Sequence, residues 1–186
     1  MSDMDQRHIL SVNGIWDVPF LRNRGALTSA FGGWQLNVME RITTGIPFNT
    51  VLGFDRALIG GGRVVGPQRP NLVGNPHLDP NRSHGELVAA YFDKAAFDLP
   101  PEGQFGSLGR NALIGPGFAK TDLGIIKRFS LGKERLGKIQ FRAEIFNLFN
   151  NVNFANPVAN RASPAFGKIQ TAYDARIAQF GLKWEF

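Results

Sequence analysis

Hydrophobic and polar residues alternate with a period of two in five segments of the chain. The segments lie near residues 8–18, 34–46, 119–130, 138–150 and 176–186. Successive side chains of a β-strand point to opposite faces, so this pattern predicts five strands, each with one apolar and one polar face. We therefore expect an all-β fold: an antiparallel meander in sequence order, with the first and fifth strands at its edges.

The length of these segments favours strands that cross a membrane. At about 10 to 13 residues they exceed the ~5–6 residues usual in soluble sheets. They match the ~9–11 residues that a tilted strand needs to cross a bilayer. The pattern predicts part of a transmembrane outer-membrane β-barrel.

The connections between the strands also alternate in length. Residues 47–118 and 151–174 are long, 131–137 are short, and 19–33 are intermediate. Long structureless connections are uncommon in compact soluble domains, whereas outer-membrane barrels have long extracellular loops and short periplasmic turns. We expect 47–118 and 151–174 outside the cell and 131–137 in the periplasm.

The long connection 47–118 contains one signal for regular structure. Ser83 and Glu86 have the spacing of a capping box and precede an apolar run, which predicts a short helix near 84–92. Several prolines and a triple glycine at 60–62 indicate irregular chain elsewhere.

Composition and charge narrow the alternatives. Among 186 residues there are 22 Gly and 11 Pro, which is typical of a turn-rich β protein, and there is no Cys, which excludes disulfides and thiol catalysis. The net charge is +6, but the basic residues are scattered singly, so we expect no nucleic-acid partner. Residues 1–6 do not resemble a signal peptide, and the uncharged stretch 42–54 is too short for a membrane helix.

No set of residues has the spacing of a catalytic or cofactor site. His77 and His84 lie near Asp79 and Glu86, so a weak metal site is conceivable, but an exposed loop is the favoured interpretation. The glycine-rich segments lack the Lys-Ser/Thr of a phosphate loop, and no serine has a triad pattern. We expect no enzyme activity, no cofactor and no metal.

The final strand carries the strongest signal. Phe180, Leu182, Trp184 and Phe186 occupy alternate positions up to the last residue. A soluble domain rarely finishes on its most apolar strand because chain ends prefer water. The last strand of a barrel, in contrast, presents alternate apolar residues to lipid.

Several stretches together resemble a known family. They are GGWQLN (32–37), TGIPFN (44–49), YFDKAAFDLP (91–100), GQFGSLGRNALIGPGF (103–118), FRAEIFNLFNNVNF (141–154) and FGLKWEF (180–186). In this order they resemble the C-terminal β-barrel segment of a TonB-dependent receptor, in the Oar-like group with an N-terminal carboxypeptidase-regulatory-like domain.

The resemblance implies a location, partners and a function. Receptors of this family are 22-stranded barrels of the bacterial outer membrane with an internal plug, and they take up large ligands with energy from the TonB complex. The chain would be a C-terminal fragment of such a receptor, in contact with lipid, with TonB reached only through the absent plug and the transported ligand unknown. Its final strand, with Phe180, Leu182, Trp184 and Phe186, resembles the assembly signal read by the barrel-insertion machinery.

One alternative to the membrane barrel stays open from the sequence. A soluble β-sandwich that acts as a binding module would pack its apolar faces together and dissolve without detergent.

Glu40 falls on the apolar face of the second strand, where a carboxylate facing lipid is unfavourable. A bulge near Met39 or contact with another subunit would each account for it.

Overall fold

The computed structural model describes residues 2–19, 32–60, 67–130 and 137–185, and its contacts divide the chain into two compact units. The sheet unit comprises residues 9–43, 118–152 and 174–186. The loop unit comprises residues 1–8, 44–117 and 153–173.

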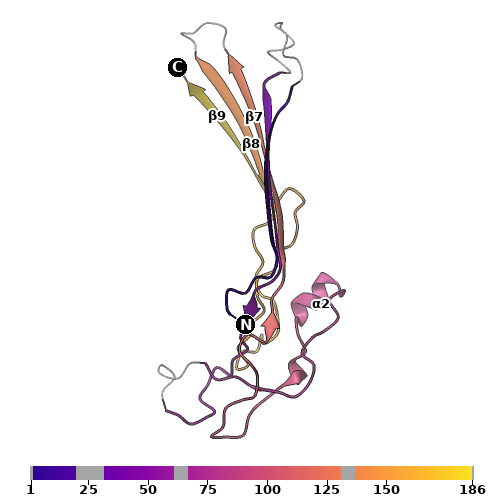
Figure 1. Cartoon of the computed structure of the whole chain (residues 1–186), viewed down its shortest axis with the longest axis vertical. Helices are drawn as coiled ribbons and strands as arrows, with labels where there is room; N and C mark the ends of the chain where they lie inside the picture. Colours follow the sequence, from indigo (N-terminus) through magenta and orange to yellow (C-terminus); the bar gives the residue numbers. More distant parts are fainter. Residues whose placement is uncertain (1, 20–31, 61–66, 131–136, 186) are drawn as a thin grey trace. The chain divides into compact units, whose positions relative to one another are not determined.

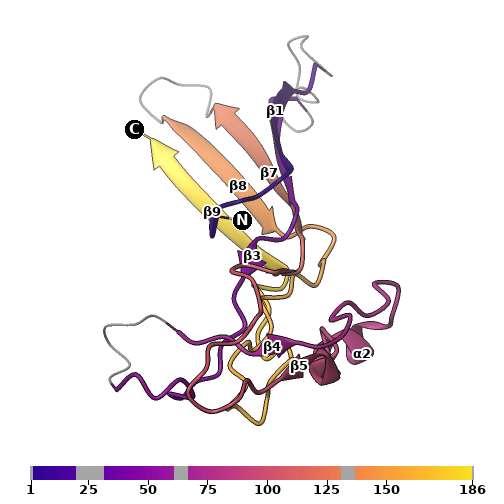
Figure 2. The same ribbon diagram turned by 60° about the horizontal axis from the view of Figure 1, so that its bottom comes forward.

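The sheet unit is one five-stranded antiparallel sheet (Figure 1). Its strands are β1 (Ile9–Asp17), β2 (Trp34–Thr43), β7 (Phe118–Ser130), β8 (Lys138–Phe146) and β9 (Ile177–Glu185). They pair in the order β1-β2-β7-β8-β9, and Figure 2 shows β7, β8 and β9 side by side. The expected meander in sequence order, with the first and fifth strands at the edges, is confirmed.

Residue pairing is continuous across the whole sheet. Along one row, Trp16 pairs with Leu36, Leu36 with Ile125, Ile125 with Ala143 and Ala143 with Phe180. Directly paired residues of an antiparallel sheet lie on the same face. The mainly apolar phase of each strand therefore lies on one face, and the mainly polar phase lies on the other, together with Ile15, Met39 and Ile126.

The register also shows where the connections leave the sheet. Thr43 pairs with Phe118 and Phe146 with Ile177, so residues 44–117 and 147–176 leave from one end. Asp17 pairs with Gln35 at the opposite end, which is also the end of the β7–β8 hairpin. The two long connections share an end, as their alternation in length predicts; residues 131–136 of the short one lie outside the described residues.

One strand stops before its expected end because of an asparagine turn. We expected a strand over 138–150, but β8 ends at Phe146. Asn147 has a φ of +54°, its amide N–H donates to Asp122, and its side chain bonds to the backbone of Asn151 and Asp174. The run NLFNN therefore turns the chain toward β9 rather than extending the ladder.

The second expected strand, 34–46, also ends early, at Thr43. Gly45 follows, and a Cβ at this position would lie 1.8 Å from the carbonyl oxygen of Gly115. The backbone beyond it forms a separate pair of two-residue strands, β3 (Pro47–Phe48) and β6 (Leu113–Ile114). TGIPFN and the end of GQFGSLGRNALIGPGF are thus packed together, and only glycine fits where they cross.

The loop unit contains little regular structure besides this pair. A second pair joins β4 (Asn71–Leu72) to β5 (Phe97–Asp98), next to the 3-10 helix η1 (Lys94–Ala96). The helix α2 covers His84–Ala89, shorter than the expected 84–92. Its capping box is present: Ser83 accepts from the Glu86 N–H, and Glu86 accepts from the Ser83 N–H at 2.9 Å.

Phenylalanines form the core of the loop unit. The ring of Phe92 contacts those of Phe48, Phe97 and Phe166 at centroid distances of 6.3, 5.3 and 5.1 Å. Phe92 and Phe97 are each 2% exposed and come from the YFDKAAFDLP stretch. Residues 47–118, which we expected to be irregular apart from one helix, therefore form a core together with Phe166 of the second long connection.

Truncation of this core should open the loop unit. We expect Phe92→Ala to lower the free energy of opening by about 3–5 kcal/mol, because it removes a buried ring from a close-packed cluster. Phe105→Ala, at a position that is 61% exposed, is the matched control and should change it by less than about 0.5 kcal/mol. Amide hydrogen exchange of residues 92–113 measures both, and equal protection in the two variants would contradict this core.

Candidate functional site

The apolar face of the sheet is exposed and continuous. It carries Leu10, Val12, Trp16, Leu36, Val38, Ile42, Leu123, Ile125, Phe129, Ile139, Phe141, Ile145, Phe180, Leu182 and Trp184. On β9, Phe180 and Leu182 are each 74% exposed and Trp184 is 60% exposed. The structure places these three expected site residues on the apolar face; Phe186, the fourth, lies outside the described residues.

Aromatic residues gather on this face toward the end where the β7–β8 hairpin lies. Trp16, Trp34 and Trp184, which are all the tryptophans of the chain, belong to it, together with Phe129. Aromatic side chains of this kind mark the interface between lipid tails and headgroups. We call these four residues the aromatic belt.

The aromatic belt crosses the strands at a slope. Trp16 pairs with the residue two positions after Trp34, and Trp34 pairs with Lys127, two positions before Phe129. Phe129 and Trp184 flank the same β8 residue. The belt thus shifts by four residues over four strand spacings, which at ~3.3 Å per residue and ~4.8 Å per strand corresponds to a tilt of about 35°. Strands of outer-membrane barrels are tilted by about 35–45°.

One cation lies on the apolar face beside the aromatic belt. Lys127 is 1% exposed, and its Nζ donates to the carbonyl oxygen of Gly32. The ammonium lies 5.3 Å from the Trp34 ring centroid and 5.1 Å from that of Phe129. The side chain runs along apolar surface toward the end of the sheet, as lysines near a membrane interface do.

One carboxylate also lies on the apolar face. The register runs unbroken through Glu40, between Val12 and Thr121, so the bulge near Met39 that we considered is wrong. The Glu40 carboxylate accepts a hydrogen bond from the hydroxyl of Thr121, which is itself 7% exposed. A partner on the neighbouring strand partly offsets the cost of a carboxylate on this face.

The opposite face of the sheet is mainly polar and carries charge pairs, although Ile9, Ile15 and Met39 also lie on it. Arg142 lies 3.5 Å from Glu144, which also accepts from Gln179 at 2.5 Å. Lys183 and Glu185 pair at 2.7 Å on β9. This face has the character of a water-filled barrel interior.

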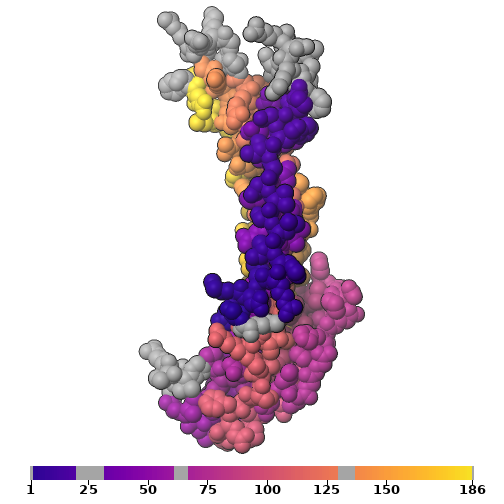
Figure 3. All heavy atoms as spheres, in the orientation of Figure 1, coloured from indigo at the N-terminus to yellow at the C-terminus, as the bar shows by residue number. Residues whose placement is uncertain are grey.

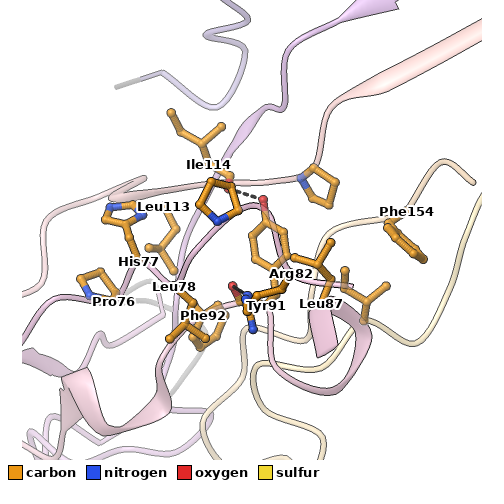
Figure 4. Close-up of a pocket in the computed structure, with 13 residues that line it drawn as sticks. Pro76, His77, Leu78, Arg82, Leu87, Tyr91, Phe92, Leu113, Ile114 and Phe154 are labelled. Carbon is orange, nitrogen blue, oxygen red and sulfur yellow. Dashed lines mark hydrogen bonds between the residues drawn. The ribbon is translucent and has the colours of Figure 1, made fainter. Parts of the chain in front are cut away.

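The loop unit contains a pocket of ≈ 300 Å³ (Figure 4). Its wall is largely apolar, with Pro76, Leu78, Leu87, Ile114, Phe154 and Ile169 among the lining residues. His77, Arg82 and Tyr91 add polar groups. Chain segments far apart in the sequence therefore meet around the pocket. The alternation of hydrophobic and polar residues does not predict it.

Hydrogen bonds hold the polar groups of the pocket in place. The Tyr91 hydroxyl donates to the Ile114 carbonyl oxygen at 3.0 Å, and burial raises the pKa of Tyr91, which keeps the phenol neutral. The Arg82 guanidinium donates to the carbonyl oxygens of Ala90 and Asp79, at 2.8 Å each. These bonds tie the ends of the α2 segment to each other.

The two candidate histidines have different contacts in the structure. His77 lies at the pocket, whereas the ring of His84 packs edge-on against Phe154 at 5.5 Å. Glu86 is engaged in the capping box, and the Ser83 hydroxyl lowers the pKa of its carboxyl. Across the described ranges, no three His, Asp or Glu side chains gather in a way that could hold a metal ion.

Comparison with known proteins gives one match. The model of the family described as "Outer membrane beta barrel domain" matches residues 1–179. The chain belongs to this family. Searches of curated proteins and of solved structures gave no match.

Membership in the outer membrane beta barrel domain family explains the exposed apolar face. The domain is located in the bacterial outer membrane, where lipid covers such a face. The soluble sandwich is wrong, because it requires the face that holds Phe180 and Leu182 to be buried against a second sheet. In the part of the chain that the structure describes, no helix is long and apolar enough to cross a membrane.

Two features of this outer membrane beta barrel domain, the position of Lys127 and the pocket, were not predicted from the sequence. Lys127 interrupts the apolar alternation of β7, and only the register places it beside Trp34 on the neighbouring strand. The sequence did hold one indication: Lys127 is a lone lysine at a position where the alternation of this strand calls for an apolar residue. The pocket gave no signal of this kind.

The Glu40–Thr121 pair permits a direct test of how the domain tolerates a charge on its apolar face. Thr121→Val should destabilise the sheet by about 1–3 kcal/mol, because it leaves the carboxylate without its hydrogen-bond donor. The double variant Glu40→Leu with Thr121→Val should recover most of that loss, since both partners become apolar. Urea unfolding in lipid vesicles measures the difference, and a double variant less stable than Thr121→Val would contradict the assignment.

Proposed function

We propose that this outer membrane beta barrel domain forms part of the wall of a TonB-dependent receptor that takes up a large ligand with energy from the inner membrane. The proposal is carried by one observation: the two long connections, which leave the same end of the sheet, fold into a single loop unit. The six stretches that resemble the Oar-like receptors support it, because they map onto both units.

The two long connections depend on each other for their structure. Phe166 packs against Phe92 and Phe97 in one core. Val51 N–H donates to the Ala159 carbonyl oxygen and Arg161 N–H to that of Val51. A folded extracellular surface suits the capture of a ligand, whereas mobile loops would have to be ordered at each binding event.

The proposal assigns a partner to each surface. Outer-membrane lipid would cover the apolar face, and the polar face would line the interior of the barrel. The barrel-insertion machinery would read the last strand, and the TonB complex would be reached through a plug domain rather than through these strands. We propose no enzyme activity, no cofactor and no nucleic-acid partner.

An experiment on the intact protein tests the receptor assignment. An antibody against the sequence YFDKAAFDLP should detect an outer-membrane protein much larger than 20.5 kDa, because a receptor barrel needs many more strands. That protein should crosslink to TonB in wild-type cells and not after removal of the plug. A detected protein of about this mass, or one that never crosslinks to TonB, would contradict the proposal.

The assembly role of the last strand has a separate test. Deletion of Phe186 from the full-length protein should reduce its abundance in the outer membrane far more than Lys183→Gln does. Phe186 continues the apolar phase of Phe180 and Trp184, whereas Lys183 pairs with Glu185 on the polar face, where an exposed ion pair contributes little. Abundance in outer-membrane fractions is the measurement, with surface protease accessibility as a folding control. Equal abundance would show that the strand is not the assembly signal.

A further inference from the structure

We propose that the pocket of the loop unit binds an anionic amphiphile, namely an aromatic or branched aliphatic group attached to a carboxylate, as at the C-terminus of a hydrophobic peptide. The inference goes beyond the uptake function and does not rest on it, because binding to the loop unit needs neither a plug nor TonB.

Backbone hydrogen bonds between the surrounding segments fix the walls of the pocket without the help of a ligand. Tyr91 N–H donates to the Gly167 carbonyl oxygen at 2.7 Å, and Ile169 N–H to that of Val88 at 3.0 Å. Asp93 N–H donates to the Pro76 carbonyl oxygen at 2.9 Å, and Phe92, which lines the pocket, belongs to the phenylalanine core. A site whose walls are fixed in advance binds without the cost of ordering them.

The wall of the pocket selects an apolar group. Leucine, isoleucine, proline and phenylalanine side chains surround it, as Figure 4 shows for Leu78, Leu87, Ile114 and Phe154. The volume of the pocket is ≈ 300 Å³. This is room for one ring with a short polar chain, and not for a whole large ligand.

The charge of the pocket selects an anion. Arg82 is a lining residue, and among the described residues no carboxylate lies within 4 Å of its guanidinium. A guanidinium has five N–H donors, of which three donate to the carbonyl oxygens of Asp79, Ala90 and Tyr91. Two N–H groups remain, and although the charge of Arg82 also lowers the pKa of the Glu86 carboxyl, no ion pair neutralises it among the described residues; a carboxylate is a group that such donors bind well.

The hydroxyl of Tyr91 adds a second preference. Its hydrogen is committed to the Ile114 carbonyl oxygen, so toward a ligand the oxygen can only accept. A ligand with an amide N–H near its carboxylate, as an acylated primary α-amino acid has, offers a donor to Tyr91 and an acceptor to Arg82.

The test compares three probes on the full chain in phosphatidylcholine nanodiscs, with empty nanodiscs as the blank. N-acetyl-L-phenylalanine should bind saturably by saturation-transfer NMR. N-acetyl-L-phenylalaninamide keeps the ring and lacks the charge, and N-acetylglycine keeps the charge and lacks the ring. Each should bind at least about tenfold more weakly, the factor that corresponds to about 1.4 kcal/mol.

A pair of matched variants locates the binding. Ile114→Trp should fill the pocket and weaken binding of N-acetyl-L-phenylalanine by about tenfold or more. Leu72→Trp adds the same side chain to another two-residue strand of the loop unit, at a similar exposure of 41% against 38%, and should leave binding unchanged. Amide hydrogen exchange of residues 92–113 verifies that both variants keep the phenylalanine core.

Three results would overturn the proposal. They are absence of saturable binding, equal affinity for the acid and the amide, and equal loss in the two tryptophan variants. None of these bears on TonB crosslinking, so failure here is distinguishable from failure of the receptor assignment.

Discussion

The sheet depends on one constraint: in lipid, every backbone N–H and C=O must find a partner within the protein, because no water is present to replace it. The ladders from β1 to β9 are paired residue by residue, without a bulge even at Glu40. This continuity keeps the side chains of all five strands in phase, so that one face is apolar except at Glu40, Thr121 and Lys127. Among the described residues, the outer edges of β1 and β9 have no pairing strand, and the indigo segment that contains β1 is visible at the surface in Figure 3. Such edges require further strands in a closed barrel.

Polar side chains on the apolar face obey the same constraint. Glu40 and Lys127 are each bonded to a group of the sheet unit, Glu40 to the Thr121 hydroxyl and Lys127 to the carbonyl oxygen of Gly32, just before β2. Lys127 lies beside the aromatic belt, where headgroups and water approach, so its charge costs less than at the centre of the bilayer. Glu40 has no such position beside the belt, and its hydroxyl partner lies one strand away. The two charges are therefore accommodated by different means.

The loop unit meets its backbone requirements with side chains, because it has few ladders. The guanidinium groups of three arginines donate to carbonyl oxygens across long sequence separations: Arg56 to Pro100, Arg69 to Leu108 and Arg161 to Phe97. Arg82 does the same within the α2 segment. Part of the positive charge of the chain thus has a structural use, in agreement with the scattered placement of its basic residues in the sequence. The phenylalanine core supplies the apolar burial that these bonds surround.

The alternation of residues by itself determined the five strands, their antiparallel order and the faces on which Phe180, Leu182 and Trp184 lie. It could do so because a strand's side-chain period is set by backbone geometry and not by its neighbours. The capping box at Ser83 and Glu86 was readable for the same reason, since its contacts lie within one turn. The strand ends at Thr43 and Phe146, the partner of Glu40, the contacts of Lys127 and the pocket beside Arg82 and Tyr91 were decided by tertiary structure alone. Each of them depends on segments tens of residues apart, such as Gly45 against Gly115 or Phe97 against Phe166, and no local period records which distant segments will meet.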